Sequence, residues 1–411
     1  MFQVLMKGGV KSLYICYFGL REPLVQTQVL PYLIHLAKKG VVISLLTFEP
    51  EPSNHWSEEA IGSEKQKLKD LGIDWRFKTY HKRPSAPATL YDIFSGALSA
   101  AGIVRNKKIQ VIHCRAHIPV AMGLLVRKLT GARLIFDIRG FMADEYADAG
   151  IWAKESLTYR IIKRLEDAGI RAADHIVVLT QRARNYLVEH KGVNEEKIDV
   201  VPCCVDLENR AGPAELKNRE RFELVYAGSV TGLYLLPEMA DFFLKLKNER
   251  KNAFFRILTL GDRSSVSEVF SLKGIEETDY SVEAVPPDEV LSEISRAHLA
   301  ISFRKPTFAQ IAASPTKIPE YLSAGVPVVT NAGIGDTDQF VEDTRTGVVV
   351  GNFEQQTLQA AVQLSLELVA DESAARRCRE AVKRNYSLET VGGPAYERVY
   401  EKLSANSGEL A

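Results

Sequence analysis

One lysine and one glutamate stand three residues apart in the stretch "SPTKIPEYLSAGVPVV" near residue 320. Lys317 suits a phosphate, because a unit charge pair at about 4 Å and an effective dielectric near 20 attracts by about 4 kcal/mol before desolvation. The carboxylate of Glu320 only accepts hydrogen bonds, and the vicinal hydroxyls of a ribose are natural donors to it. A surface ion pair at this spacing, contributing a few tenths of a kcal/mol, is the alternative. The pair therefore favours nucleotide binding, with a solvated ion pair as its rival.

The elements around this pair place it at the ligand-binding edge of a predicted sheet. Residues 298–303 ("HLAISF") predict a buried strand, and the loop that follows, with Arg304 in it, is too long for a simple connection. The next stretch predicts a helix that Ser314 or Thr316 caps and Gly325 ends. A helix that begins at the carboxyl end of a strand offers free N–H groups to a phosphate.

Strand-like and helical patterns alternate along nearly the whole chain. Such alternation indicates βαβ units, and hence parallel sheets covered on both faces. The predicted strands are residues 12–18, 41–48, 110–114, 133–138, 175–180 and 198–202, then 223–228, 254–261, 280–285, 298–303, 326–330 and 347–351. The predicted helices of the first half are residues 27–39, 58–71, 89–106, 119–130 and 155–172. The fold class is therefore predicted as α/β, with two Rossmann-like domains whose parallel sheets face a central cleft.

The alternation pauses once, after Pro202, in a polar segment that contains proline and glycine. Such a segment is typical of a connection between domains. We expect an N-terminal domain at residues 1–205, a linker at 206–221 and a C-terminal domain at 222–388. A last helix in residues 389–411 is compatible with packing on either domain, including back on the N-terminal one.

The composition is that of a globular protein. The chain has 411 residues, of which 46% are hydrophobic and 25% charged, values that set disordered, collagen-like and coiled-coil proteins aside. No apolar run approaches the roughly 20 residues that span a bilayer, and residues 1–10 lack the apolar run of a secretory signal, so a cytoplasmic location is expected. The five cysteines have no CxxC spacing, and we expect neither a disulfide nor a zinc site.

A net charge of zero hides an asymmetry between the two halves. Residues 1–200 contain 29 Lys and Arg against 21 Asp and Glu, which gives the first half +8 and leaves the second half with −8. A basic half is expected to meet an anionic partner such as a membrane surface, a phosphorylated acceptor or nucleic acid. Two oppositely charged surfaces that attract one another across a cleft are the alternative.

Familiar nucleotide and metal motifs do not fit this chain. Neither "GLREPLVQ" after the first strand nor "GSVTGLYLL" after residues 223–228 matches the dinucleotide fingerprint GxGxxG, and a P-loop is absent. Asp336 and Asp338 are typical of a helix start rather than of a metal site. His113 and His117 are irregularly placed for a metal pair, so His117 is expected as a loop histidine bonded to substrate or backbone. No metal site is expected.

The stretch "FDIRGFMADEY" at residues 136–146 follows an apolar strand and crowds charged residues at the ligand end of the first sheet. Binding residues concentrate on such loops, which makes Arg139 a candidate. A solvated loop with internal ion pairs is the alternative.

The stretch "PTKIPEYLSAGVPVV", followed by "TGVVV", resembles the nucleotide-sugar site of glycosyltransferase family 4, whose members have the GT-B fold. The likeness covers most of the chain, since "PYLIHLAKKGVVISLLT", "AADHIVVLTQRARNYL", "VVPCCVDLENR" and "LVYAGS" also resemble family segments. In detail the chain resembles bacterial members that build surface polysaccharides. The resemblance implies an acceptor-side domain at residues 1–205 and a nucleotide-sugar-binding domain at 222–388.

The resemblance also implies an activity. It implies a retaining, metal-independent hexosyltransferase that moves a sugar from a nucleoside diphosphate sugar, with UDP favoured, to a saccharide or lipid-linked acceptor. It implies no cofactor, since the nucleotide sugar is a substrate, and no nucleic-acid partner.

Roles for individual residues follow from the same resemblance. Glu320 would bind the ribose of the donor, while Lys317 and Arg304 would face the diphosphate. His117 and Arg139 would face the transferred sugar and the acceptor, which makes Lys317, Arg304, His117 and Arg139 the catalytic set. The other donor-binding residues would be Thr316, Ser314, Gly228, Ser229, Gly19 and Arg21.

The chain departs from the family pattern at three places. Ala312 stands where the family commonly has a glutamate, "GSVTGLYLL" lacks the usual Arg and Lys, and "GLREPL" replaces a glycine pair. Charge stabilisation would then rest on Lys317, Arg304 and Arg21. A GT-B sugar-nucleotide epimerase and a non-catalytic scaffold that binds nucleotide sugars are the alternatives.

Two basic stretches, residues 76–83 ("RFKTYHKR") and 104–109 ("VRNKKI"), are candidates for contact with an anionic membrane that carries a lipid-linked acceptor. Solvated surfaces are the alternative. With this contact, the expected location is the inner face of the cytoplasmic membrane.

Overall fold

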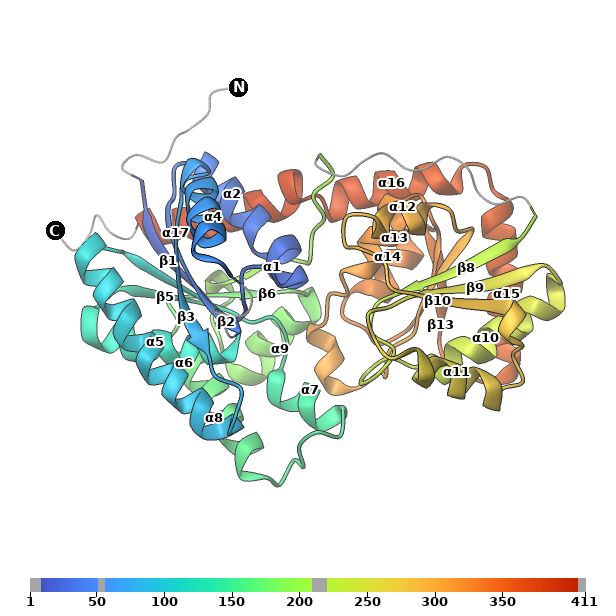
Figure 1. Ribbon diagram of the computed structural model, residues 1–411, viewed down its shortest axis with the longest axis horizontal. Helices are drawn as coiled ribbons and strands as arrows, with labels where there is room; N and C mark the ends of the chain where they lie inside the picture. Colours follow the sequence, from blue (N-terminus) through green and yellow to red (C-terminus); the bar gives the residue numbers. More distant parts are fainter. Residues whose placement is uncertain (1–8, 51–55, 209–219, 406–411) are drawn as a thin grey trace. The chain divides into compact units, whose positions relative to one another are not determined.

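The computed structural model describes residues 9–50, 56–208 and 220–405 (Figure 1). The chain forms two compact units, which consist of Met1–Pro202 with Val391–Ala411 (unit 1) and of Cys203–Thr390 (unit 2). Each unit contains one parallel sheet, so the predicted α/β class with two parallel sheets is confirmed. Most of the predicted linker, residues 209–219 of 206–221, lies outside the described residues.

The sheet of unit 1 has seven strands in the order β3-β2-β1-β4-β5-β6-β7. All neighbouring strands pair in parallel, so their carboxyl ends lie along one edge. The strands are β1 (Lys11–Cys16), β2 (Val42–Pro50), β3 (Ile73–Tyr80), β4 (Val111–Arg115), β5 (Arg133–Asp137), β6 (His175–Val178) and β7 (Ile198–Val200).

Strand β3 was not among the predicted strands. Ile73, Trp75 and Phe77 alternate with charged residues, and this period of two is typical of a half-buried edge strand. The charges of the run "RFKTYHKR" obscure this apolar alternation, so the sequence predicts only a basic cluster there. The first part of that run is therefore an edge strand paired with β2.

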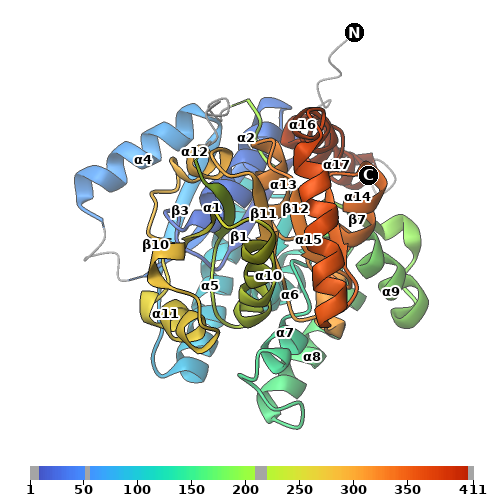
Figure 2. The same cartoon turned by 90° about the vertical axis from the view of Figure 1, so that its right-hand side faces the viewer.

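The helices of unit 1 cover both faces of its sheet. Right-handed crossovers put the helices that lead to β4, β5 and β6 on one face, and those that lead to β2 and β3 on the other. On the first face α6 packs against both α5 and α8 (Figures 1 and 2). The helices are α1 (Pro23–Gln28), α2 (Leu30–Lys38), α4 (Glu58–Asp70), α5 (Ser85–Lys107), α6 (His117–Thr130), α7 (Met142–Asp148), α8 (Leu157–Ala172), α9 (Gln181–Lys191) and α17 (Gly393–Ala405).

The C-terminal helix α17 packs on α2 within unit 1. The Tyr400 hydroxyl forms hydrogen bonds with Ser12 Oγ at 3.0 Å and with His113 Nδ1 at 2.9 Å. Both partners lie in strands of the sheet, so the end of the chain contributes polar side chains to the interior of unit 1.

The sheet of unit 2 has six strands in the order β10-β9-β8-β11-β12-β13, again all parallel. The strands are β8 (Phe222–Ala227), β9 (Ala253–Leu258), β10 (Tyr280–Glu283), β11 (Leu299–Ser302), β12 (Val328–Asn331) and β13 (Gly347–Val350). The helices are α10 (Leu236–Glu249), α11 (Arg263–Leu272), α12 (Val290–Ser295), α13 (Lys317–Ser323), α14 (Thr337–Thr344), α15 (Gln355–Ala370) and α16 (Ala374–Asn385), with a 3-10 turn η3 (Phe308–Ala312).

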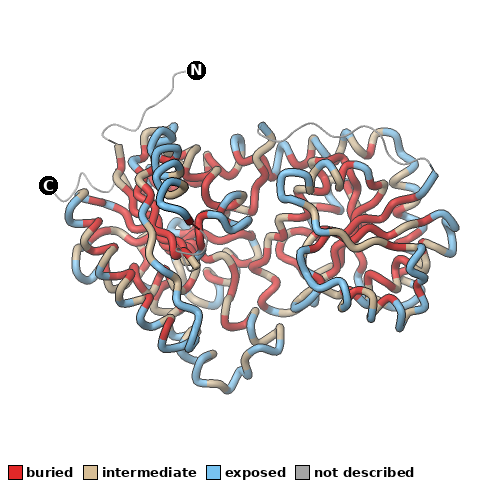
Figure 3. The backbone as a smooth tube through the Cα atoms, in the orientation of Figure 1, coloured by how far each residue is buried: buried red, intermediate tan, exposed pale blue. Residues whose placement is uncertain are grey.

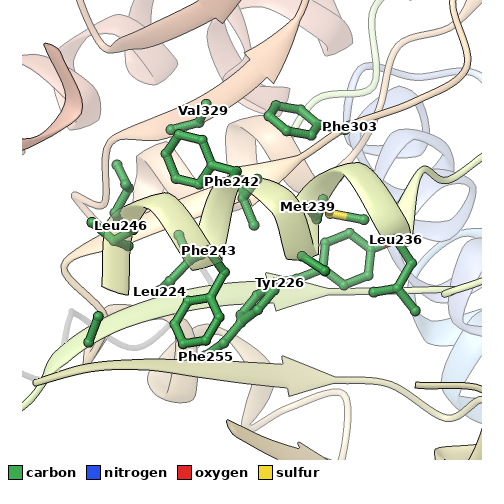
Figure 4. Packing of buried hydrophobic residues seen from close by; sticks show 14 of the residues in the cluster. Leu224, Tyr226, Leu236, Met239, Phe242, Phe243, Leu246, Phe255, Phe303 and Val329 are labelled. Atoms are coloured by element: carbon green, nitrogen blue, oxygen red, sulfur yellow. The ribbon is translucent and has the colours of Figure 1, made fainter. Parts of the chain in front are cut away.

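Alternate side chains of β8 belong to two different apolar cores in unit 2. Leu224 and Tyr226 pack with α10 on one face, whereas Val225 and Ala227 join the core under α13 on the other. Figure 4 shows α10 lying over β8 with its apolar side chains directed at the sheet. Most strands of the two sheets, apart from the edge strands β3 and β10, are buried (red in Figure 3), and their near-continuous apolar sequences fit this burial.

Within the described residues, no helix has the length and apolar character needed to cross a membrane. All five cysteines are buried free thiols.

Candidate active site

Three neighbouring strands of unit 2 end beside one another and present polar residues. β8 leads into Gly228 and Ser229, β11 leads into Arg304, and β12 ends at Asn331. The Asn331 side chain fixes the backbone of Arg304, accepting from its N–H at 2.8 Å and donating to its carbonyl at 2.9 Å. These strand ends form the ligand edge that parallel sheets use for binding.

Lys317 reaches the same edge from α13. Its side chain is buried, and Nζ donates a 2.9 Å hydrogen bond to the Tyr226 hydroxyl. Nζ also lies 3.7 Å from the centre of the Tyr234 ring and 4.2 Å from that of Tyr226. The Arg304 guanidinium lies 5.1 Å from the Tyr234 ring, so one aromatic ring contacts both cations. Aromatic faces attract cations without neutralising their charge.

The electrostatic environment of Lys317 lacks a direct counter-ion. Burial lowers the pKa of Lys317 well below its usual value, Arg304 lowers it further, and Glu320 opposes the change. Within the described part of the chain, no carboxylate forms an ion pair with Lys317. The surface ion pair with Glu320 is therefore not formed. A buried charge without a partner is costly, and a bound anion would stabilise it.

Gly228 makes room for the Lys317 side chain. Its φ is +136°, which favours glycine, and a Cβ there would lie 2.6 Å from Lys317 Nζ. The next residue, Ser229, accepts a hydrogen bond from the Tyr226 hydroxyl through its carbonyl. The family pattern has an Arg and a Lys directly after this strand. In this chain the ammonium group beside Gly228 belongs instead to Lys317 of α13.

The ends of α13 differ in how well the sequence predicted them. Thr316 is the N-cap residue but makes no side-chain capping bond, and Ser314 Oγ instead accepts from Cys203 N–H at 3.1 Å. The prediction that one of these side chains caps the helix is therefore wrong. The Ser314 hydroxyl accepts a hydrogen bond from the backbone at Cys203 instead, and the Thr316 hydroxyl makes no capping bond. The predicted end at Gly325 is confirmed: its φ is +77°, its N–H bonds to the Leu322 carbonyl and the next N–H bonds to that of Tyr321.

The loop between β11 and α13 holds polar atoms that lack partners. Gln310 is fully buried, and neither its side-chain oxygen nor its nitrogen has a hydrogen-bond partner within the described residues. Arg304 Nε and Thr307 Oγ1 are likewise buried without a partner there. Ala312 is buried, and Glu320 is partly exposed in the first turn of α13. This loop thus presents unused polar groups near the position of the missing glutamate.

The two aspartates near α14 have no metal-site geometry. Asp338 accepts hydrogen bonds from the backbone N–H groups of Gly333 and Gln339, both at 2.9 Å. No group of three or more His, Cys, Asp and Glu side chains in the described ranges is arranged to hold a metal ion.

In unit 1 the loop after β1 is held by a buried glutamate. Glu49 accepts from Leu20 N–H at 2.9 Å, and a Cβ on Gly19 would lie 2.9 Å from its Oε2. The exposed Arg21 stacks on the Trp56 ring at 3.7 Å. Gly19 is therefore needed for a close approach between the loop and Glu49, and Arg21 stays on the surface.

The sequence predicted that His117 lies in a loop, and this prediction is wrong, because His117 is the first residue of α6. It is buried, and Nε2 lies 2.9 Å from Glu166, which Lys163 contacts at 2.6 Å. Lys163 also binds Asp144 at 2.9 Å. His117 is thus one member of an internal network that α8 completes.

Arg139 belongs to a second buried cluster, centred on Asp137. The Asp137 carboxylate accepts from the Tyr396 hydroxyl at 2.9 Å and lies 3.4 to 3.7 Å from Arg139, His113 and Arg115. Burial alone would raise the pKa of Asp137, but Arg139, the His113 hydrogen bond and Arg115 outweigh it and hold the pKa well below its usual range. Asp137 is therefore internally paired, as in the alternative, but it is buried at the end of β5 rather than on a solvated loop.

The structure groups the predicted residues into separate sets. Lys317, Arg304, Gly228 and Ser229 meet around two tyrosines of unit 2, whereas His117 and Arg139 lie in two buried networks of unit 1. The sequence did not single out the residues that complete these sets, which are Tyr226, Tyr234, Asn331, Glu49, Glu166 and Tyr396. Most of these positions depend on how helices pack on the sheets, which the sequence does not show. Only Asn331 could have been predicted, because it directly follows a predicted strand.

Two parallel α/β units with polar ligand edges define a protein of the GT-B fold class. Similar solved structures include a glycosyltransferase from Rickettsia africae (TM-score 0.69, 12% identity, 97% of this chain and 100% of that chain). A sucrose-phosphate synthase from Thermosynechococcus elongatus has a TM-score of 0.70 at 14% identity, over 97% and 100% of the two chains. HepE from Anabaena, in complex with UDP and glucose, has a TM-score of 0.64 at 13% identity, over 96% and 99%.

The Glycosyltransferase Family 4 model matches residues 25–209. This match confirms, over those residues, the resemblance to the family that the sequence predicted. None of the curated proteins matches the chain. The motif around Lys317 lies outside the matched range, so the roles of its residues rest on the geometry of unit 2.

Proposed function

We propose that the protein is a retaining, hexosyltransferase-type glycosyltransferase. It moves a sugar from a nucleoside diphosphate sugar, with UDP as the favoured nucleotide, to a saccharide or lipid-linked acceptor in glycan biosynthesis. Family 4 similarity over residues 25–209 supports the activity. The bound UDP and glucose of the similar HepE structure support the donor.

One observation in unit 2 carries the proposal. The Lys317 ammonium is buried at the ligand edge, beside Arg304 and two aromatic rings, without an ion-paired carboxylate among the described residues. A diphosphate at this edge would supply the missing negative charge. The same charge would return the pKa of Lys317 toward its usual value.

The remaining donor contacts are assigned around this cation. Glu320, one turn further along α13, is assigned to the ribose hydroxyls, because its carboxylate can only accept. Thr316, Ser314, Gly228 and Ser229 line the phosphate side through their backbone groups. Because α13 has only seven residues, Lys317 rather than the helix dipole supplies most of the positive potential.

The proposed chemistry is electrostatic. Negative charge builds up on the leaving diphosphate, and Lys317 with Arg304 stabilises that charge from positions already fixed by Tyr226, Tyr234 and Asn331. The departing phosphate accepts the proton of the attacking hydroxyl, so no protein nucleophile is needed. No metal ion is needed either, because the two side chains provide the positive charge.

Unit 1 is assigned the acceptor side. Gly19 and Arg21 belong to the loop that would approach the phosphates, and His117 and Arg139 would face the transferred sugar and the acceptor. The buried networks around His117 and Asp137 would hold these side chains in place. A cytoplasmic location at the inner membrane face fits a lipid-linked acceptor.

One assay separates this function from its alternatives. The protein is incubated with a panel of UDP, GDP and ADP sugars, with and without lipid-linked acceptors and with and without EDTA. Release of nucleoside diphosphate that depends on acceptor and survives EDTA supports the proposal. An isomerised sugar nucleotide would identify an epimerase, and donor binding without any reaction would identify a scaffold.

A further inference from the structure

The outer surfaces of α5, α6 and α8 carry large apolar side chains that face solvent. Large exposed apolar surfaces on folded proteins mark interaction sites. We call the exposed residues of these three helices the α5–α8 face. Its large apolar members are Leu90, Tyr91, Phe94, Leu98, Leu129, Leu157 and Ile161.

Helix α5 has an inverted apolar pattern. A surface helix normally turns its large apolar residues to the core, but α5 buries mainly Ala, Gly, Ile and Val residues. The contact is close, since a Cβ on Gly96 would lie 2.8 Å from both Met122 and Phe48. The inner face of α5 is therefore well packed, and its outer apolar residues are not the result of a loose core.

The outer side of α5 forms a continuous stripe. Leu90, Phe94 and Leu98 follow at four-residue spacing and are 56%, 58% and 71% exposed, and Tyr91 beside them is 61% exposed. Residues at this spacing lie on one side of a helix. On α8, Leu157 and Ile161 repeat the same spacing at 70% and 50% exposure.

The charges on this face have one sign. On these three fully described helices every exposed charged residue is basic: Arg105, Lys128, Arg160, Arg164 and Arg171. Their acidic residues are withdrawn from the surface, since Asp92 and Glu166 are buried and the partly buried Asp167 pairs with Lys191 at 2.8 Å. Lys82 and Arg83, exposed just before α5, extend the basic border, and just before α8 the exposed Lys154 and Glu155 offset one another.

Helix α4, on the other face of the same sheet, provides an internal contrast. It exposes acidic and basic residues together, including Glu58, Glu59, Lys65, Lys69 and Asp70, and none of its large apolar residues is exposed. The excess positive charge of the first half of the chain is thus accompanied by exposed apolar groups on one side of unit 1.

We propose that the α5–α8 face docks peripherally on a bilayer that contains anionic lipid. The apolar stripe of α5 enters the boundary between headgroups and acyl chains, and the surrounding Lys and Arg residues contact anionic headgroups. Basic charges complement such a lipid, whereas a second copy of this surface would repel them. Docking goes beyond the proposed sugar transfer, and a binding assay without any sugar nucleotide tests it separately.

The test is co-sedimentation of the full-length protein with vesicles of phosphatidylcholine alone or mixed with phosphatidylglycerol. The wild type is expected to bind only the mixed vesicles, and less at high salt. The Leu90→Ser/Phe94→Ser/Leu98→Ser variant is expected to lose binding by at least about tenfold. The Lys82→Gln/Arg83→Gln variant removes two surface cations, and each is expected to contribute about fivefold.

Matched variants control for nonspecific effects. Leu260→Ser/Leu272→Ser removes two exposed leucines, 78% and 81% exposed, from unit 2 and is expected to bind like the wild type. Circular dichroism and a soluble-acceptor assay show whether each variant stays folded and active. Wild-type binding that ignores lipid charge, or equal loss in the control variant, overturns the proposal. A wild-type dimer that the α5 variant converts to a monomer would also overturn it, in favour of self-association.

Discussion

The two units treat their buried charges in opposite ways. In unit 1, His117 and Arg139 lie next to carboxylates, Glu166 and Asp137, that are themselves fully buried. In unit 2, Lys317 lies between aromatic rings and forms no ion pair among the described residues. Removing one partner of a buried ion pair is costly because the other charge is left buried, whereas an uncompensated buried charge can bind an anion. Removing a buried carboxylate of unit 1 should therefore lower mainly stability, and removing the Lys317 charge of unit 2 should lower mainly ligand affinity and turnover.

The largest effect is expected for Glu166→Ala in unit 1. Removing this buried carboxylate leaves His117 and Lys163 without their partner, and the free energy of unfolding should fall by about 3–5 kcal/mol. Urea unfolding measures the loss, and UDP affinity in the folded variant should stay within about twofold, because unit 2 is untouched. Glu155→Ala, exposed just before α8, is the control and should change stability by less than about 0.5 kcal/mol. Equal stability of both variants would contradict the assigned network.

Lys317→Met in unit 2 is the complementary change. Methionine keeps the apolar stem but removes the charge that would stabilise the leaving diphosphate, so kcat should fall by about 100- to 1,000-fold. Initial rates at saturating donor measure the change, and thermal unfolding should show no loss, because a costly buried cation is gone. Unchanged turnover and unchanged UDP affinity would refute the phosphate assignment. The epimerase and scaffold alternatives do not rescue it, because both also need the diphosphate contact.

Gly228→Ala and Gly232→Ala form a matched pair of smaller effect. Both glycines have positive φ, +136° and +76°, but a Cβ on Gly228 meets Lys317 Nζ, while nothing lies within 4 Å of one on Gly232. The backbone penalty should be about 1–2 kcal/mol at Gly232 and larger at Gly228, whose φ lies outside the left-handed α region. Only Gly228→Ala should also displace Lys317 and weaken UDP binding, which calorimetry measures. Equal UDP affinities in the two variants would show that the position of Lys317 does not matter for binding.

The sequence was sufficient for features that depend on short segments. Apolar runs of four to eight residues located most strands, and Gly325 marked the end of α13 because only a positive φ closes that turn. The pairing of Lys317 with Gly228 was expected only as two residues lining one pocket. Their direct contact, and the two tyrosines around the ammonium, depend on how α13 packs against β8, which no local pattern encodes.

The failures in prediction have two origins, long-range contacts and an exposed strand edge. Ser314 has the side chain of a helix cap, but its hydroxyl accepts from Cys203, more than 100 positions earlier in the chain. Tyr396 reaches Asp137 from the last helix, 259 positions away. Strand β3 was missed for a local reason, since charges at every second position make a half-buried edge strand resemble a polar cluster. Long-range partners and edge exposure are therefore what the sequence could not supply.

The smallest predicted effect concerns pH and tests the charge state of Lys317. Burial lowers the pKa of this side chain in the free protein, and a bound diphosphate would raise it again. Binding of UDP should therefore take up a proton between these two pKa values, and affinity should fall as pH rises, by at most about tenfold per unit. The dependence should be measured above about pH 7.5, where the diphosphate itself is ionised.

Lys317→Arg is the control for this pH dependence, because arginine stays charged throughout the range. Its UDP affinity should be nearly independent of pH, and calorimetry in two buffers should detect proton uptake only for the wild type. The stability of the free wild type should change in the opposite sense. The unfolded chain keeps the lysine proton up to about pH 10.5 while the folded one releases it earlier, so the wild type should gain stability relative to Lys317→Arg as pH rises. Parallel pH profiles for the two proteins would mean that the pKa of Lys317 is not lowered in the free protein. Its charge would then be compensated like those of unit 1, and the contrast between the two units would lose its basis.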